Sequence, residues 1–351
     1  MKSRLWLTLL ACMFACLFVC MMCVAVSVTT SAQDKAPEKG KDAGPKLTDE
    51  EGKQVDKMNK ATTVAEKTKL GIEFIKKFKK NTDYRAKVAG YLATQIFSEK
   101  DPNLKIQAAQ QFIGAFDQPG EAEQVKPALI DGYVTTGKFD EAFTEGGKYM
   151  EAHPEEVFVA ASLGLYGTTQ MQKMMQQQQP AASWKWAKAT LEYQAKAIEL
   201  LEQDKKPEQT GKEEWTTYRN SMLPRLYQAQ GAIHYSNKEL GKARESLEKA
   251  FGIDQNDIFT LNYLVGVTVD EYQELAQRYQ TEKKNELYEK AVAKMDEAID
   301  FLARGVALTD GDANKTAINT DFKDRLKQYY EFRNPGKAAD MQALVDKYKK
   351  K

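Results

Sequence analysis

The chain of 351 residues is long enough for one large or two ordinary domains with a buried core. Its charge is balanced, with 51 Lys and Arg against 50 Asp and Glu, which argues against a nucleic-acid partner because neutralising phosphates requires a basic excess. All four cysteines lie at or before Cys23, and the only histidines are His153 and His234. This composition argues against a disulfide framework, a metal site, a cofactor and His or Cys catalysis, so we expect no enzyme activity.

Residues 1–32 have the pattern of an export signal. A basic start, MKSR, precedes an uncharged run over residues 5–28, and the small residues Thr30 and Ala32 stand before a possible cleavage site at Gln33. The run is also long enough to span a bilayer, so a retained signal anchor tethering the chain through residues 5–28 is an alternative. LLAC at 9–12 also roughly resembles a lipobox, which leaves a lipoprotein as a third interpretation.

Each of these three interpretations predicts export of the remaining chain. A cleaved chain is expected in the periplasm or outside the cell, and an anchored one is expected to face the periplasm from the inner membrane. Residues 33–58 contain Pro37 and Pro45 and few large apolar groups, so they predict a disordered linker.

From about residue 60 onward the sequence predicts helices only. Apolar residues recur at spacings of three and four, for example at Ile106, Ala109, Phe112 and Phe116, and strand-like alternation is absent. Short polar breaks separate the apolar segments. We therefore expect an all-α domain over 59–351, with helices of about 12–20 residues joined by short turns.

One such break predicts a helical hairpin over 123–156. Gly137 is suited to a left-handed helix end, and Phe139 then opens a second helix that Pro154 terminates. Ala142 is expected to be small because the two helices approach closely there.

This hairpin resembles the tetratricopeptide repeat, a helix-turn-helix unit of 34 residues. Segment 123–156 matches its positions 11, 20 and 32 with Tyr133, Ala142 and Pro154, and departs from it with Gly146 and Tyr149. Segment 224–257 matches at Tyr227, Gly231, Ala243, Leu247 and Ala250, and departs with His234 and Gln255. A further frame starts at residue 258, and insertions are expected near 170–183 and 203–223. An unrelated helical bundle is the alternative.

The resemblance implies an α-solenoid whose concave surface binds a peptide or a partner helix. In this family the first helix of each pair lines that surface, which gives the candidate partner-binding residues Gln124, Asp131, Arg225, Gln228, Tyr235 and Asn262. The expected function is a non-catalytic scaffold that binds a protein or peptide of the cell envelope. The alternative is a glycan-binding protein, or an accessory protein in outer-membrane assembly or nutrient uptake.

Three other stretches have a possible function and a simpler structural explanation. The Met- and Gln-rich segment 170–180 is either an adaptable contact surface or a helix end with a solvated Gln face. Trp184 and Trp186 cannot share one helical face, so either one is an exposed binding anchor or both are partly buried at a repeat junction. The carboxylates within 269–300 alternate with Lys and Arg, which is typical of a solvated face with ion pairs four residues apart rather than of a catalytic pair.

Overall fold

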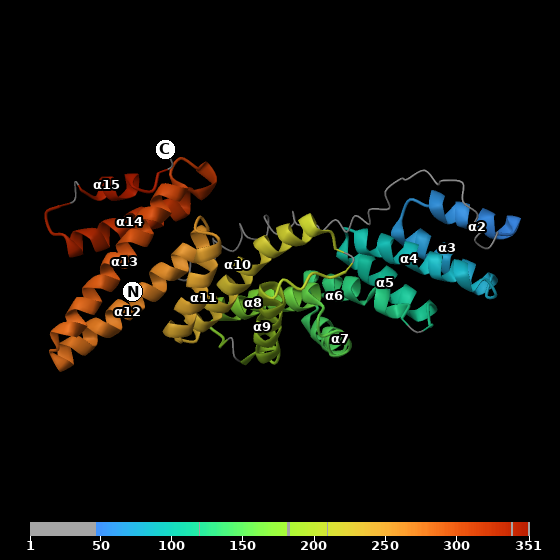
Figure 1. Cartoon of the computed structure of the whole chain (residues 1–351), viewed down its shortest axis with the longest axis horizontal. Coiled ribbons are helices and arrows are strands. Elements are labelled where there is room, and N and C mark those ends of the chain that lie inside the picture. Colours follow the sequence, from blue (N-terminus) through green and yellow to red (C-terminus); the bar gives the residue numbers. More distant parts are fainter. Residues whose placement is uncertain (1–46, 119, 181–182, 209, 338–339, 350–351) are drawn as a thin grey trace. The chain divides into compact units, whose positions relative to one another are not determined.

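The computed structural model describes residues 47–118, 120–180, 183–208, 210–337 and 340–349, and over these residues the chain is helical without any strand (Figure 1). The prediction of an all-α protein is confirmed for this part. The segment 1–32, with its predicted export signal, lies outside the described residues. Across the part that the structure describes, none of the helices combines the length and apolar character needed to span a bilayer. The helices form two compact units, unit 1 up to Trp215 and unit 2 from Thr216, where the sequence indicated a single domain over 59–351.

Unit 1 consists of helices that each pack on the next one along the chain. In addition, α3 packs on α5 and α6 packs on α8, as in a row of helix pairs. The helices are α2 (Asp49–Lys60), α3 (Val64–Lys77), α4 (Thr82–Ser98), α5 (Pro102–Ala115), α6 (Lys126–Thr135), α7 (Phe139–Ala152), α8 (Val157–Gln176) and α9 (Ala187–Glu202), with a 3-10 turn, η2 (Ala122–Gln124), before α6.

Unit 2 is dominated by a long antiparallel hairpin. Its two helices, α12 (Ile258–Glu282) and α13 (Asn285–Thr309), have 25 residues each and exceed the length expected from the repeat pattern. The other elements are α10 (Lys212–Ser236), which begins just before the unit, α11 (Leu240–Ile253), η4 (Ala313–Lys315), α14 (Thr316–Arg333) and α15 (Met341–Asp346). α12 also packs on α11, and α13 also packs on α14 and α15.

The disordered linker predicted for 33–58 is wrong in its last part, because residues from Asp49 onward form α2. Thr48 and Glu51 make a capping box: Glu51 N donates to Thr48 Oγ1 over 3.3 Å, and Thr48 N donates to Glu51 Oε2 over 2.8 Å. Met58 is buried. The low apolar content of this segment predicted disorder, but α2 forms because its cap and one buried face stabilise it. Residues 33–46 lie outside the described residues.

The predicted hairpin at Gly137 is confirmed in its local geometry. Gly137 has φ +75°, and Lys138 N donates to Tyr133 O over 2.9 Å, which is the Schellman arrangement that ends α6. The same bond to the fifth preceding residue ends α8, α9 and α10, each time after a left-handed residue that is not glycine, namely Gln178, Asp204 and Lys238. One turn chemistry therefore recurs along the chain although only one of the four turns carries glycine.

Small residues stand where helices approach closely, as the repeat pattern predicts. Ala142 and Ala243 are fully buried. A Cβ added to Gly231 would stand 2.6 Å from the Leu247 side chain. Within the insertion expected near 203–223, residues from Lys212 onward form the start of α10, which continues through Pro224.

Candidate functional site

The candidate residues of unit 1 do not lie together on one helix. Gln124 is exposed in η2, before α6 begins, so the first helix of this pair is shorter than the repeat frame implies. Asp131 lies on α6 and forms an ion pair with Lys105 of α5, with 2.7 Å between Asp131 Oδ2 and Lys105 Nζ. Asp131 therefore holds α5 to α6.

The candidate residues of unit 2 lie on α10 and α12, and two of them link these helices. Gln228 Nε2 on α10 donates to Thr260 Oγ1 over 2.9 Å and also bonds Asp257, the N-cap residue of α12. Arg225, one turn earlier on α10, is exposed and makes no hydrogen bond or ion pair with the described residues. Gln228 is thus partly a structural residue, and Arg225 is free to contact a partner.

Tyr235 lies across α12. Its hydroxyl group is 2.9 Å from the position that a Cβ on Gly266 would take, and its ring meets Tyr263 edge-on at 6.5 Å. Burial and the negative charge of Asp270 raise the pKa of the Tyr235 hydroxyl, against the opposing effect of Arg325. Tyr235 therefore keeps its proton at neutral pH and can donate a hydrogen bond.

Asn262 is held by a residue that the sequence analysis did not identify. Arg325 on α14 donates from Nη1 to Asn262 Oδ1 over 2.8 Å and to Asp321 Oδ2 over 3.1 Å. No repeat frame was recognised in 316–333, so the sequence offered no reason to single out Arg325. Its spacing of four from Asp321 was the available signal, and many surface pairs share that spacing.

These contacts join three alternate helices in one partly exposed polar surface. We call it the α10–α12–α14 face and define it by Gln228, Tyr235, Asn262, Asp270, Asp321 and Arg325. Its residues approach one another through the Gln228–Thr260, Tyr235–Gly266 and Arg325–Asn262 contacts. Three of the four candidates predicted for this part of the chain thus belong to a single surface.

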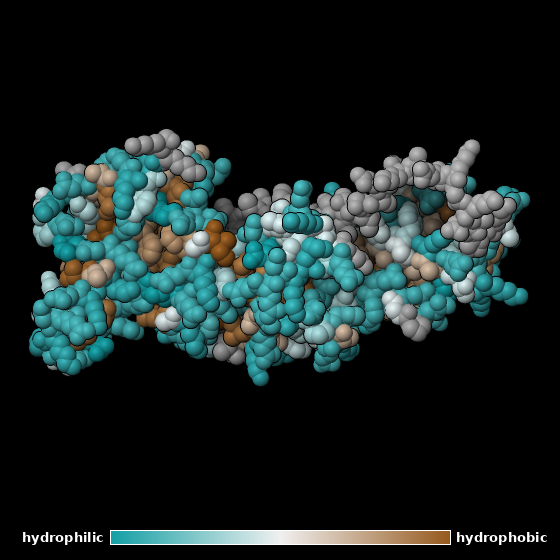
Figure 2. All heavy atoms as spheres, in the orientation of Figure 1, coloured by the Kyte–Doolittle hydropathy of each residue, from teal (hydrophilic) through white to brown (hydrophobic). Residues whose placement is uncertain are grey.

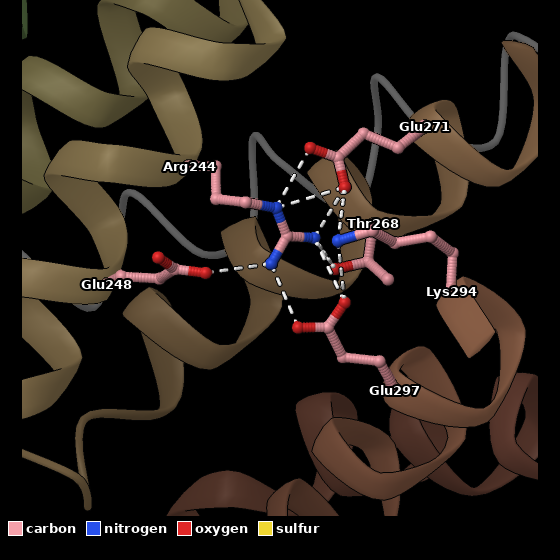
Figure 3. Close-up of polar contacts among 6 residues, drawn as sticks. All are labelled: Arg244, Glu248, Thr268, Glu271, Lys294 and Glu297. Carbon is pink, nitrogen blue, oxygen red and sulfur yellow. Dashed lines mark hydrogen bonds and ion pairs between the residues drawn. The ribbon is translucent and has the colours of Figure 1, made fainter. Parts of the chain in front are cut away.

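A second polar cluster lies between α11, α12 and α13, with Arg244 at its centre (Figure 3). The Arg244 guanidinium bonds Glu248, Thr268, Glu271 and Glu297, and Lys294 bridges the last two carboxylates at 3.0 and 3.1 Å. Burial by itself raises the pKa of Glu271, but the hydrogen bonds and charges of Arg244 and Lys294 bring that pKa below its usual value.

The carboxylates of 269–300 therefore serve two purposes. Glu286 pairs with Lys290 four residues later on one helix, as expected, whereas Glu271 and Glu297 pair with Arg244 on another helix. Because Glu271 stays ionised, it is poorly suited to donate a proton. The cluster is an interhelical clamp.

Trp184 and Trp186 of unit 1 share an aromatic cluster at the start of α9. Both contact Phe143: Trp184 edge-on at 5.4 Å and Trp186 stacked at 5.3 Å. Trp186 Nε1 donates to Asp140 over 2.8 Å, and the Lys185 ammonium lies 5.2 Å from the Trp186 ring centre. Both are partly buried, and they approach one residue because they precede α9 in a turn.

Hydrophilic residues cover most of the surface visible in Figure 2. The large hydrophobic residues that are exposed are scattered, and Phe332 is the most exposed of them at 65%. Among the described residues, no group of three or more His, Cys, Asp and Glu side chains is placed to hold a metal ion.

No protein-family model matches this chain, and no curated protein sequence matches it.

Proposed function

We propose that the helix pairs are degenerate tetratricopeptide-like repeats forming a solenoid, and that the chain is an exported, non-catalytic interaction scaffold. Its ligand is an extended segment of another envelope protein. The α10–α12–α14 face binds that segment. The observation that carries this proposal is the meeting of Tyr235, Asn262 and Arg325, from three alternate helices, in one partly exposed polar surface.

Two further observations support the repeat interpretation. Every helix of unit 1 packs on the next, with additional contacts between α3 and α5 and between α6 and α8. The Schellman turn recurs at the ends of α6, α8, α9 and α10. Stacked helix pairs of this kind present the first helix of each pair on a shared surface, and such surfaces suit extended ligands.

Neither a glycan-binding protein nor an enzyme has comparable support. Trp186 already stacks on Phe143 and donates its only N–H to Asp140, so it offers little to a sugar ring. Glu271 and Glu297 are each paired with both Arg244 and Lys294. A catalytic acid needs a raised rather than a lowered pKa.

A peptide-display selection tests the proposal. The purified full chain is immobilised, random nine-residue peptides are selected on it, and the affinities of the retained peptides are measured. The double variant Arg225→Ala plus Asn262→Ala should lose about tenfold or more in affinity, because Asn262 belongs to the face and Arg225 is an exposed side chain one turn before Gln228 on the same helix. Lys188→Ala, an exposed lysine of unit 1, is the control and should leave binding unchanged.

Two results would contradict the proposal. One is a selection that retains no peptide above the background of an empty support. The other is a set of peptides that bind the double variant as tightly as the original chain.

A further inference from the structure

The Arg325 guanidinium is held along one edge and open along the other. Nη1 donates to Asn262 and Asp321, whereas Nε and Nη2 make no hydrogen bond to the described residues and neither atom is completely enclosed. The side chain as a whole is only 13% exposed. The guanidinium is therefore fixed in position, with two parallel N–H groups left for another acceptor.

Two parallel N–H groups on a fixed guanidinium match the two oxygens of a carboxylate. Asp321 does not occupy that position, because it bonds the opposite nitrogen. A second carboxylate at the open edge would make charge-assisted hydrogen bonds to a partly desolvated guanidinium, which are stronger than at a fully exposed site and are offset in part by repulsion from Asp321. The open edge thus favours an anionic group of carboxylate shape.

An exposed aromatic residue, Phe332, lies further along the same side of α14. Arg325, Tyr329 and Phe332 follow one another at spacings of four and three, so they share a helix face. Phe332 is 65% exposed and meets Tyr272 of α12 edge-on at 6.5 Å. An apolar side chain of a ligand that covers Phe332 and Tyr272 would remove apolar surface from water, which favours binding.

The distance between Arg325 and Phe332 sets the spacing between the two ligand side chains that would contact them. Phe332 follows Arg325 by seven positions, about 10 Å along α14. A peptide in the extended polyproline II conformation has three residues per turn and rises about 3.1 Å per residue, so three residues cover that distance and bring the side chain back to the same side. An acidic residue and an apolar residue three positions apart would therefore reach both features.

We propose that the α10–α12–α14 face recognises an extended peptide segment through an Asp or Glu side chain on the open edge of Arg325, with an apolar side chain three residues away on Phe332 and Tyr272. The inference rests on the proposed function, because it names the ligand of the same face.

The test uses two libraries of nine-residue peptides on the immobilised full chain. In the first, fixed linkers flank the random residues on both sides; in the second, the peptides end in a free carboxyl group. We expect the first library to enrich an acidic residue with an apolar residue three positions away. In a retained peptide, changing the acidic residue from Glu to Gln should weaken binding about tenfold or more.

Arg325→Lys is the decisive variant, because it keeps the positive charge but removes the two parallel N–H groups of the guanidinium. It should weaken binding of the Glu peptide about tenfold and leave the Gln peptide nearly unchanged. Arg278→Lys is the control, since Arg278 on α12, like Arg325, pairs with an acid four residues away on its own helix, here Glu282. Circular dichroism of each variant confirms that it is folded.

The outcomes separate this inference from the proposed function. Two results would overturn the inference and leave the proposed function standing. One is a set of peptides that no longer bind Asn262→Ala but have no enriched acidic residue. The other is a loss of affinity from Glu to Gln in the peptide that is equally large with Arg325→Lys. Enrichment only in the second library would assign the carboxylate to a chain terminus and also overturn the inference. A selection without any retained peptide would overturn both.

Discussion

The hydroxyl group of Tyr235 on α10 lies over Gly266 on α12, 2.9 Å from the place that a Cβ would take. Gly266→Ala should therefore push Tyr235 aside and lower the free energy of unfolding by about 1–3 kcal/mol, less the modest gain in helix propensity. Urea denaturation measures this change. Tyr235→Phe removes the nearest atom, so the double variant should recover part of the loss.

The matched control for this prediction is Gly252→Ala on α11. Gly252 has no neighbour within 4 Å of an added Cβ, so this change should leave stability equal or slightly increased. Equal destabilisation by both glycine substitutions would contradict close packing of Tyr235 on Gly266.

The clamp at Arg244 should be the most sensitive polar feature of unit 2. Arg244→Ala leaves the partly buried Glu271 without its guanidinium partner, so the free energy of unfolding should fall by about 3 kcal/mol. Lys249→Ala on the same helix is the comparison: its pair with Glu245 is largely exposed and should contribute less than about 0.5 kcal/mol. Thermal denaturation distinguishes these outcomes, and losses of similar size would refute the clamp.

The same clamp predicts an acid-sensitive part of the stability. The folded pKa of Glu271 is below its ordinary value of 4.5. The stabilisation that follows is complete above that ordinary pKa and is lost as the pH falls through the folded value. Denaturation curves of the original chain and of Glu271→Gln should therefore differ most at neutral pH and converge below pH 4.5. A difference that is constant with pH would show that the Glu271 charge is not responsible.

The capping box of α2 predicts a local effect. Thr48→Ala removes the acceptor of Glu51 N and should destabilise the first turn of α2 by about 1 kcal/mol. Hydrogen exchange should become faster at the amides of that turn and remain unchanged in α12. Thr62→Ala, in the connection before α3, is the control and should leave exchange in α2 unchanged. Unaltered exchange in Thr48→Ala would mean that packing alone holds this helix end.

Several features could be predicted because their signals are local. The spacing of apolar residues indicated helices, and Gly137 indicated a left-handed helix end, which its φ of +75° confirms. Thr48 and Glu51 carry a capping-box spacing that would have placed α2 correctly, had it been weighed against the polar composition of that segment. Each of these signals acts within about five residues, where sequence and backbone geometry are directly coupled.

The tertiary structure decided which distant side chains meet. Arg325 and Asn262 are 63 residues apart, and Arg244 and Glu297 are 53 apart. Nothing in the local sequence ranks these pairs above many others of opposite charge or matching polarity. Their contact depends on how far each helix extends and how it is rotated against its neighbour, and the packing of buried residues such as Leu247 and Leu264 sets both. The sequence by itself determined the helices and several of their ends; packing determined the face that we propose binds a partner.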